Sequence, residues 1–549
     1  MNTYGYTLLK PKERRSAEVL EEIDRTIRKD MPGMATPVKI HLGGIVEPIT
    51  PPKRTKKVKK QSQPKTRQKV ARPAQSRTTS VKKRIDKATQ GTRVQADYAR
   101  IIALIPTYEK ESDIDKTVIS LLLQTRQVDQ IIVVINGPGE SDAAYDAILP
   151  LVGEFRDQLI VERPYDLNGR NEDGSSKGSK VNALNWMYWR YIQMGDFDFV
   201  LGLDADVEAD KDMVHHLETD LIRRVRAGGV MARYSFKIPS GKEMRGKSLS
   251  LIHGQRHEFA VTGIRQQLRG NRSEILGGQA TLFRAEALRE AARMTDGGAP
   301  WDYETLVEDA ELTRTLQKLG YTNATSAEAR AWVGPMYTPH TWQRQRRKWQ
   351  DGHFADMIRD FHPWIDRRRW FKQVALGWNL ALRILFLVVL VTSIALNQFI
   401  FSPIWFIPIA LAILQSILVT TKVPNVTFRE IVRSVLFLPG EVYYTRILAV
   451  WLDSALVAMA NIQRDGWANQ HKAEAAEQRN ALSSWILIIT AVAVPTVALF
   501  MANRFLPVDI MSNVLTTLWY TVTFLTIGST VSMAYFILRI IRNYRTLAP

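Results

Sequence analysis

The sequence predicts an α/β domain followed by a membrane-spanning helical region. Over residues 98–355, short apolar runs alternate with amphipathic stretches, which is typical of a mixed sheet whose strands are mainly parallel. Beyond residue 356, several apolar stretches are long enough to cross a bilayer. A chain of 549 residues is also too long for one compact domain. We therefore expect at least two structural units.

The first 97 residues are expected to contribute little to a packed core. Residues 1–50 form an N-terminal segment, and residues 51–97 form a basic linker rich in Pro, Gln, Ser and Thr, a composition typical of disorder. Asp86 is the single acid between residues 51 and 95, so part of the net charge of +19 is concentrated there. We expect this arm to contact anionic membrane lipids, with no specific nucleic acid as partner.

Four apolar runs are predicted to be strands, and a helix over residues 113–125 connects the first two. In an open sheet of this kind, ligands bind beyond the carboxyl ends of the strands. Residues 106–110, 136–139 and 204–206 follow strands and are expected to face one cleft. The predicted strands cover residues 101–105, 130–135, 159–162 and 199–203.

Four later stretches are predicted to span the membrane, and residues 426–462, which mix charges with apolar side chains, are predicted to lie in the interface or to add a further crossing. The N-terminus has no apolar run resembling a signal peptide, so we expect it to stay in the cytoplasm. The positive-inside rule then makes the α/β domain cytoplasmic, on an integral protein of the plasma or inner membrane. The predicted spans are 378–396, 398–420, 482–501 and 514–538, and the basic flanks are 367–369, 471–479 and 539–545.

Two aspartates, Asp204 and Asp206, end the apolar run 199–203. Carboxylates that converge at the edge of a sheet repel each other, and a bound divalent cation relieves that repulsion. The chain has no cysteine, so thiolate metal sites, disulfides and a cysteine nucleophile are excluded. Oxygen ligands favour a hard ion, Mg2+ or Mn2+. The other Asp-x-Asp triplets fall at helix starts or in polar turns, where solvated carboxylates are the simpler interpretation.

Two more segments carry candidate chemistry. Glu308 and Asp309 begin a predicted helix, where a carboxylate can either accept a proton from a hydroxyl or simply interact with the helix dipole. Residues 342–349 combine two tryptophans with four cations just before the first predicted span. That cluster is either a lipid-facing collar or a diphosphate contact with Trp349 as a flat face for a sugar ring. His340 is a further candidate for reaching the metal.

Taken in order, six segments resemble the membrane-embedded family 2 glycosyltransferases, the group that includes hyaluronan, cellulose and poly-N-acetylglucosamine synthases. The third segment, Asp-Ala-Asp, is similar to the metal-binding triplet, the fifth to the Thr-Glu-Asp motif, and the last to Gln-x-x-Arg-Trp. The segments are 105–109, 178–185, 204–206, 277–280, 307–309 and 345–349.

The resemblance implies a glycosyltransferase A-type fold and inverting transfer of a sugar from a nucleotide-sugar, expected to be a UDP-sugar, with Mg2+ or Mn2+ as cofactor. The acceptor would be a polysaccharide or another glycan. It implies Asp309, beside Glu308, as the general base, Asp204 and Asp206 as metal ligands, and Gly278, Gln279 and Trp349 at the acceptor. The implied donor-binding residues are Pro106, Thr107, Glu109, Asn136, Lys180, Asp204, Gln345, Arg346 and Arg347.

Three departures from the family pattern bear on this expectation. Asn136 stands where many relatives carry an aspartate, and Lys348 stands where they carry an arginine, so base and diphosphate contacts are expected to differ. No predicted span precedes the α/β domain. The alternatives are transfer of a single sugar to a polyprenyl or other lipid acceptor, and a non-enzymatic membrane anchor whose basic arm binds lipid or nucleic acid.

Overall fold

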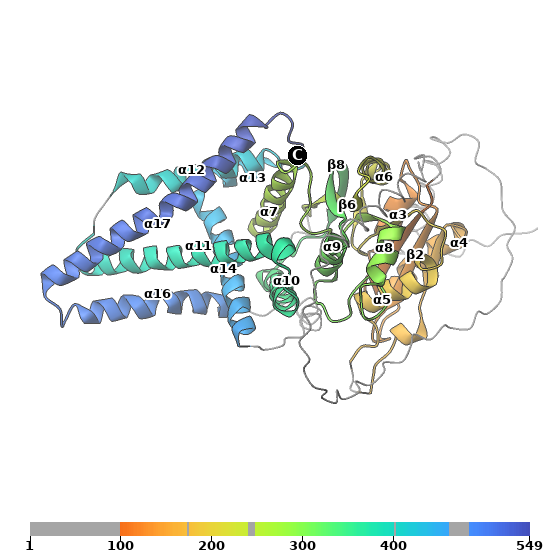
Figure 1. The fold of residues 1–549 in the computed structure, drawn as a ribbon, viewed down its shortest axis with the longest axis horizontal. Coiled ribbons are helices and arrows are strands. Elements are labelled where there is room, and N and C mark those ends of the chain that lie inside the picture. The colour runs from red at the N-terminus through yellow and green to blue at the C-terminus, as the bar shows by residue number, and fades with distance from the viewer. Residues whose placement is uncertain (1–98, 173–174, 240–246, 400–401, 461–481) are drawn as a thin grey trace, which may run out of the picture. The chain divides into compact units, whose positions relative to one another are not determined.

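The structure of the protein is a computed structural model that describes residues 99–172, 175–239, 247–399, 402–460 and 482–549, with side chains omitted for residues 482–485 (Figure 1). All of these residues belong to one compact unit. The N-terminal segment, the basic linker and the basic flank 471–479 lie outside the described residues, so the predictions made for them stay predictions.

In the described part of the chain, eight strands form one mixed sheet in the order β3-β2-β1-β4-β7-β6-β8-β5. The four predicted strands are its parallel half, in which Ile105 of β1 is paired with Val133 of β2. β7 runs antiparallel to both β4 and β6, which makes the sheet mixed. The strands are β1 (Ile101–Tyr108), β2 (Gln130–Asn136), β3 (Leu159–Glu162), β4 (Phe199–Gly202), β5 (Glu208–Ala209), β6 (Ala227–Phe236), β7 (Thr281–Arg284) and β8 (Thr322–Val333).

Helices pack on the sheet through apolar residues at helical spacing. In α3 (Ile114–Leu122), Ile114, Val118 and Leu121 are fully buried, on the side that the sequence predicted. The residues of β1 from Ile101 to Ile105 are also fully buried, as expected for a parallel strand covered on both faces. The other helices of this region are α4 (Ala143–Glu154), η2 (Tyr165–Leu167), α5 (Lys180–Met187), η3 (Tyr188–Ile192), α6 (Met213–Arg223), α7 (Leu249–Gln267), α8 (Ala285–Ala292) and α9 (Glu308–Lys318).

The C-terminal region is helical, and four of its segments are long and apolar enough to cross a membrane: Pro363–Ala395, Pro403–Thr420, Phe437–Met459 and Val508–Arg542. Three of them overlap predicted spans. The helices are α10 (Pro339–Arg359), α11 (Pro363–Ala395), η5 (Pro403–Trp405), α12 (Phe406–Thr420), α13 (Phe428–Val435), α14 (Phe437–Met459), α16 (Leu482–Ala502) and α17 (Val508–Arg542).

Of the two alternatives for residues 426–462, the helix α14 fits the further crossing, because by length and composition it qualifies as a span. Two of its charges are paired with other helices: Glu441 forms an ion pair with Arg383 of α11, and Asp453 lies 2.6 Å from Arg347 of α10. In Figure 1, α14 runs across the direction that α11, α16 and α17 share. The predicted span 482–501 forms the helix α16, whose apolar described part is the shorter segment Ile486–Ala502.

A buried ion pair ties the sheet domain to the first span. Arg314 of α9 donates to both carboxylate oxygens of Asp366 in the first turn of α11, at 2.9 and 2.7 Å, and also to Glu311 at 2.7 Å. Both Arg314 and Asp366 are fully buried. A two-point guanidinium–carboxylate contact of this kind fixes geometry as well as distance. The start of α11 is therefore held at a defined position against the helix that carries Asp309.

Candidate active site

One large cavity, of about 1690 Å³, lies at the carboxyl ends of the parallel strands. Pro106 from β1, Asn136 from β2 and Asp204 after β4 all line it, as the topology of an open sheet predicts. The cavity continues past α9 and α10 to residues of α11 and α17. It therefore connects the sheet edge to the membrane helices.

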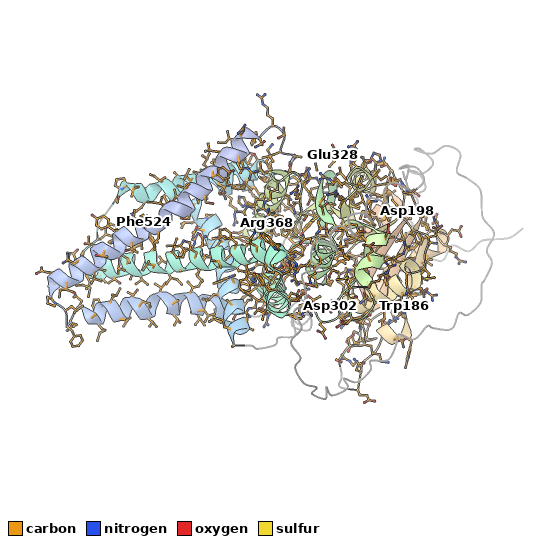
Figure 2. All side chains as sticks on the ribbon, in the orientation of Figure 1. Trp186, Asp198, Asp302, Glu328, Arg368 and Phe524 are labelled. Carbon is orange, nitrogen blue, oxygen red and sulfur yellow. The ribbon has the colours of Figure 1, made fainter. Side chains whose placement is uncertain are left out.

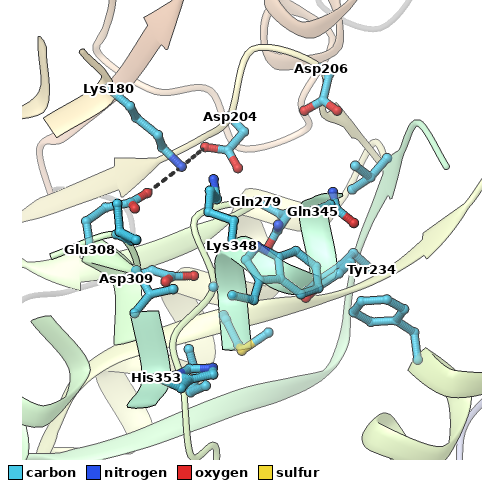
Figure 3. Close-up of a pocket in the computed structure, with 18 of the residues that line it drawn as sticks. Lys180, Asp204, Asp206, Tyr234, Gln279, Glu308, Asp309, Gln345, Lys348 and His353 are labelled. Carbon is cyan, nitrogen blue, oxygen red and sulfur yellow. Dashed lines mark ion pairs between the residues drawn. The ribbon is translucent and has the colours of Figure 1, made fainter. Parts of the chain in front are cut away.

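Lys180 joins two carboxylates at the centre of this cavity (Figure 3). Its Nζ lies 2.5 Å from Asp204 Oδ1 and 2.8 Å from Glu308 Oε1. Lys180 is the first residue of α5, a helix start fixed by Ser179, whose hydroxyl accepts a hydrogen bond from the Asn182 amide. Burial disfavours the charge, but Asp204 and Glu308 more than compensate and raise the pKa of Lys180 above its usual value. Lys180 is therefore a permanent cation.

Asp309 is a buried carboxylate whose environment suits it to accept a proton. Its Oδ1 accepts from the Ala310 amide at 2.7 Å, and its Oδ2 lies 3.4 Å from the Gly278 amide. Burial, reinforced by the charge of Glu308, raises the pKa of Asp309 to about 6. A carboxylate with that pKa is ionised at neutral pH yet binds a proton far better than a solvated aspartate, which general base catalysis requires.

Asp204 and Asp206 fit a divalent cation. Burial raises the pKa of Asp206 to about 7, with further contributions from Asp204 and Glu111, so the ionised form is unfavourable without a compensating positive charge. Among the described residues, no group of three or more His, Asp or Glu side chains forms a complete metal site. The two aspartates would therefore share a hard cation with oxygens from a ligand or water, as is usual for Mg2+.

The helix α10 presents Gln345, Lys348 and Trp349 to the cavity, since residues three and four apart lie on one helix face. Arg346 and Arg347 are not among the lining residues. Arg346 lies 2.9 Å from Glu258 of α7 and stacks over Trp349, while Arg347 pairs with Asp453 as described above. Burial lowers the pKa of Lys348 to about 8. The cation that α10 gives to the cavity is thus the lysine that replaces the family's arginine.

The expected donor residues divide into two groups. Pro106 and Asn136 line the cavity, and the Asn136 amide donates to the Thr107 carbonyl at 3.0 Å. Thr107 and Glu109 are fully buried. The Thr107 hydroxyl donates to the Ile105 carbonyl, and the Glu109 carboxylate accepts from two backbone amides in the turn after β2, at 2.7 and 3.1 Å. Their side chains therefore shape the strand ends, outside the cavity lining.

Gly278 and Gln279 lie in the segment before β7, and Gln279 lines the cavity. A Cβ atom on Gly278 would lie 2.8 Å from Lys180 Nζ and 3.2 Å from Asp204 Oδ1, so a side chain here would displace the central ion pair. His340, in the first turn of α10, is not among the lining residues. Tyr234, His353 and a group of cations near α7 and α11 also line the cavity, although sequence reasoning did not single them out as site residues. The signal for the cations was the basic run 367–369, which was interpreted as a membrane flank.

Comparisons with known proteins relate this chain to glycosyltransferases. Residues 239–419 match a family model described as glycosyl transferase family group 2. The poly-beta-1,6-N-acetyl-D-glucosamine synthase of Staphylococcus epidermidis is 24% identical over 285 residues, covering 50% of this chain and 60% of the relative. That of Staphylococcus aureus strain COL is 24% identical over 276 residues, covering 49% and 58%. The chain thus matches somewhat over half the length of these relatives.

Among solved structures, a mannosyltransferase of Pyrobaculum calidifontis, determined with GDP-Man and Mn2+, aligns over 77% of this chain and 97% of its own, with 13% identity and a TM-score of 0.36. An agreement this loose supports no comparison of the two sites. The predicted fold class, a glycosyltransferase A-type mixed sheet followed by a helical membrane region, is confirmed by the sheet, the family match and the four candidate spans together.

Proposed function

Because the chain is a membrane-embedded family 2 glycosyltransferase, we propose that it transfers a sugar with inversion from a nucleotide-sugar, such as a UDP-sugar, to a glycan acceptor at the cytoplasmic membrane face. The observation that carries this proposal is the convergence of Lys180, Asp204, Glu308 and Asp309 in one cavity that reaches the membrane helices. The basic flanks of the spans support the cytoplasmic orientation.

In the proposed reaction, the acceptor hydroxyl oxygen attacks the anomeric carbon of the donor from the face opposite the diphosphate. The bond from that carbon to the diphosphate oxygen breaks, a nucleoside diphosphate leaves, and the hydroxyl proton passes to Asp309. The backbone amides of Ala310 and Gly278 hold the Asp309 carboxylate in position for this step. Orientation of the two reactants in the enclosed cavity would supply much of the rate enhancement.

A divalent cation, Mg2+ or Mn2+, held by Asp204 and Asp206 would neutralise charge developing on the leaving diphosphate. Lys180 holds Asp204 and Glu308 in register, and Lys348 adds a second positive charge to the cavity lining. We assign Asn136 and Pro106 to the nucleoside, with Thr107 and Glu109 supporting that wall. Gln345 and Lys348 would face the diphosphate. Arg346 and Arg347 would hold α10 in position through their ion pairs with α7 and α14.

The acceptor is assigned to Gly278, Gln279 and Trp349. Trp349 offers a flat aromatic face to the cavity and is held by the Arg346 guanidinium, 4.5 Å from its ring centroid. Gly278 keeps the backbone close to the central ion pair, which leaves room beside Asp309 for a hydroxyl.

The test is nucleotide release by the purified, detergent-solubilised full chain with Mg2+ or Mn2+ and UDP-, GDP- or dTDP-sugars. We expect release from one donor, dependent on the metal, and a product whose size separates polymer synthesis from single transfer. Release from no donor, even with glycan and lipid acceptors present, would contradict the proposal.

A further inference from the structure

The end of the cavity nearest the membrane is strongly basic. We call this end the basic wing and define it by six lining cations: Arg265, Arg269, Arg272, Arg367, Arg368 and Lys372. They come from two separate parts of the chain, the end of α7 with the loop after it and the first turns of α11. Figure 2 labels Arg368 near the start of α11. The same cavity holds Asp309 and Asp204 at its other end.

The carboxylate among these cations is Glu274. It pairs with Arg269, and although burial opposes its charge, Arg269, Lys372 and Arg368 hold the pKa of Glu274 below its usual value. The influence on one carboxylate of Arg269, from the loop after α7, and of Arg368 and Lys372, from α11, indicates that the two parts of the chain present their charges to the same space. One carboxylate against six cations leaves this space with an excess of positive charge.

Apolar groups of the membrane helices border the basic wing. Phe371, 75% exposed, and Ser532 of α17 both line the cavity, and the Arg265 guanidinium lies 5.3 Å from the ring centroid of Phe536 in α17. The helix α11 has 33 residues, whereas about 20 suffice to cross a bilayer. Its basic first turns therefore extend beyond the apolar part, to the level at which lipid headgroups lie.

We propose that the basic wing binds the phosphate headgroup of an anionic membrane lipid, which presents the acceptor to the catalytic end of the cavity; this rests on the proposed function. Arginine guanidinium groups match phosphate oxygens with paired hydrogen bonds, whereas a neutral sugar chain needs aromatic faces and neutral polar groups. The lipid chain would leave the cavity beside Phe371 and Ser532, into the bilayer. A soluble phosphate would use the same cations without the apolar contact to Phe371.

The test measures binding by the full chain in phosphatidylcholine nanodiscs, without donor. The probes are a 15-carbon polyprenyl monophosphate, dioleoyl phosphatidic acid and inorganic phosphate. The variant Arg368→Ala/Lys372→Ala removes two cations of the basic wing. Its matched control, Arg429→Ala/Arg545→Ala, removes two exposed cations of membrane-side segments that do not line the cavity.

We expect the first variant to weaken binding of the lipid phosphates by about thirtyfold, because each of the two removed cations contributes about fivefold near a lipid surface. In the control variant, binding of the lipid phosphates should stay within about twofold of that by the unaltered chain. Nucleotide-sugar binding should be unchanged in both variants. No binding by the unaltered chain, or no loss in the first variant, would overturn the proposal. Binding of inorganic phosphate as tight as that of the lipids would identify a soluble-anion site. A parallel loss of donor binding in the first variant would assign these cations to the donor. Either result would also overturn the proposal. Since no transfer is measured, the proposed function can fail or hold independently.

Discussion

The two ends of the cavity differ in how their charges are balanced. At the catalytic end, Lys180 lies between Asp204 and Glu308 at hydrogen-bonding distance, so cations and carboxylates fix one another in place. At the membrane end, six cations and Glu274 line the cavity, and Glu274 pairs with one of them, Arg269. A buried cluster whose charges pair at hydrogen-bonding distance is rigid and suits chemistry, whereas an excess of one sign attracts a ligand of opposite charge. One cavity thus combines a reaction site with a charged site for recruitment.

The largest effect is expected from Asp309→Asn, at the catalytic end of the cavity. An amide cannot accept the acceptor proton, so we expect transfer to fall by about 10²–10⁴-fold while donor binding persists. The measurement is nucleotide release together with donor binding by calorimetry. Glu304→Gln, an exposed carboxylate in the loop before α9, is the matched control and should retain activity. Full activity in the Asp309 variant would show that the proton goes elsewhere.

The second change breaks the buried ion pair between Arg314 of α9 and Asp366 of α11. Arg314→Met removes the two-point partner of the buried Asp366 and leaves it only the more distant Arg369, at 3.8 Å, so we expect a loss of about 3–5 kcal/mol in the free energy of unfolding. Lys318→Met, one turn later on α9, removes a partly exposed ion pair with Asp360. This variant should change the free energy of unfolding by about 0–1 kcal/mol. Denaturant unfolding in detergent compares the two. Equal effects would mean that the buried pair contributes no more than a surface one.

A smaller effect is expected from Gly278→Ala. The added Cβ would meet Lys180 Nζ at 2.8 Å, so the ion pair with Asp204 must shift. Overpacking of this size costs about 1–3 kcal/mol, which we expect to appear as weaker metal-dependent donor binding. Gly153→Ala, in α4, is the control, because a Cβ there meets nothing within 4 Å. If donor binding stayed unchanged in both, close packing around Lys180 would not matter for the donor.

The smallest expected effect is on the pH dependence of the transfer rate. Asp309 has a raised pKa of about 6, so it becomes protonated and loses activity as pH falls through that value. Lys348 has a lowered pKa of about 8, so it loses its charge, and with it donor affinity, as pH rises through that value. Steady-state rates from pH 5 to 10 should therefore be bell-shaped. Lys348→Arg should move only the alkaline limb upward; an unchanged limb would exclude Lys348 as its source.

The sequence was most informative where one local pattern determines the structure. Apolar runs predicted the four parallel strands, because strands buried on both faces need continuous apolar residues. The position of Asp204 and Asp206 after β4 followed from the same rule. The antiparallel strand β7 and the long strands β6 and β8 were not predicted, since their pairing depends on residues far apart in the chain.

Site residues were harder to predict where a side chain has more than one possible partner. The cations at 346–348 are indistinguishable in sequence, yet Arg346 and Arg347 face Glu258 and Asp453 while Lys348 faces the cavity. Helical periodicity could have separated them only if the facing side of α10 had been known. The basic wing was missed for a related reason, since its two halves lie about a hundred residues apart in sequence.

The bond between Arg314 and Asp366 has a practical consequence for anyone who wishes to produce the catalytic part as a water-soluble fragment. A cut at residue 355, where the sequence suggests a boundary, would discard Asp366, one of the two carboxylates that pair with the fully buried Arg314 guanidinium. The same cut would remove Tyr443, whose hydroxyl lies 3.2 Å from the buried Trp342 indole nitrogen. The first membrane helix is, in this sense, part of the folding unit that makes the enzyme, and solubilisation with detergent is the sounder route to an active preparation.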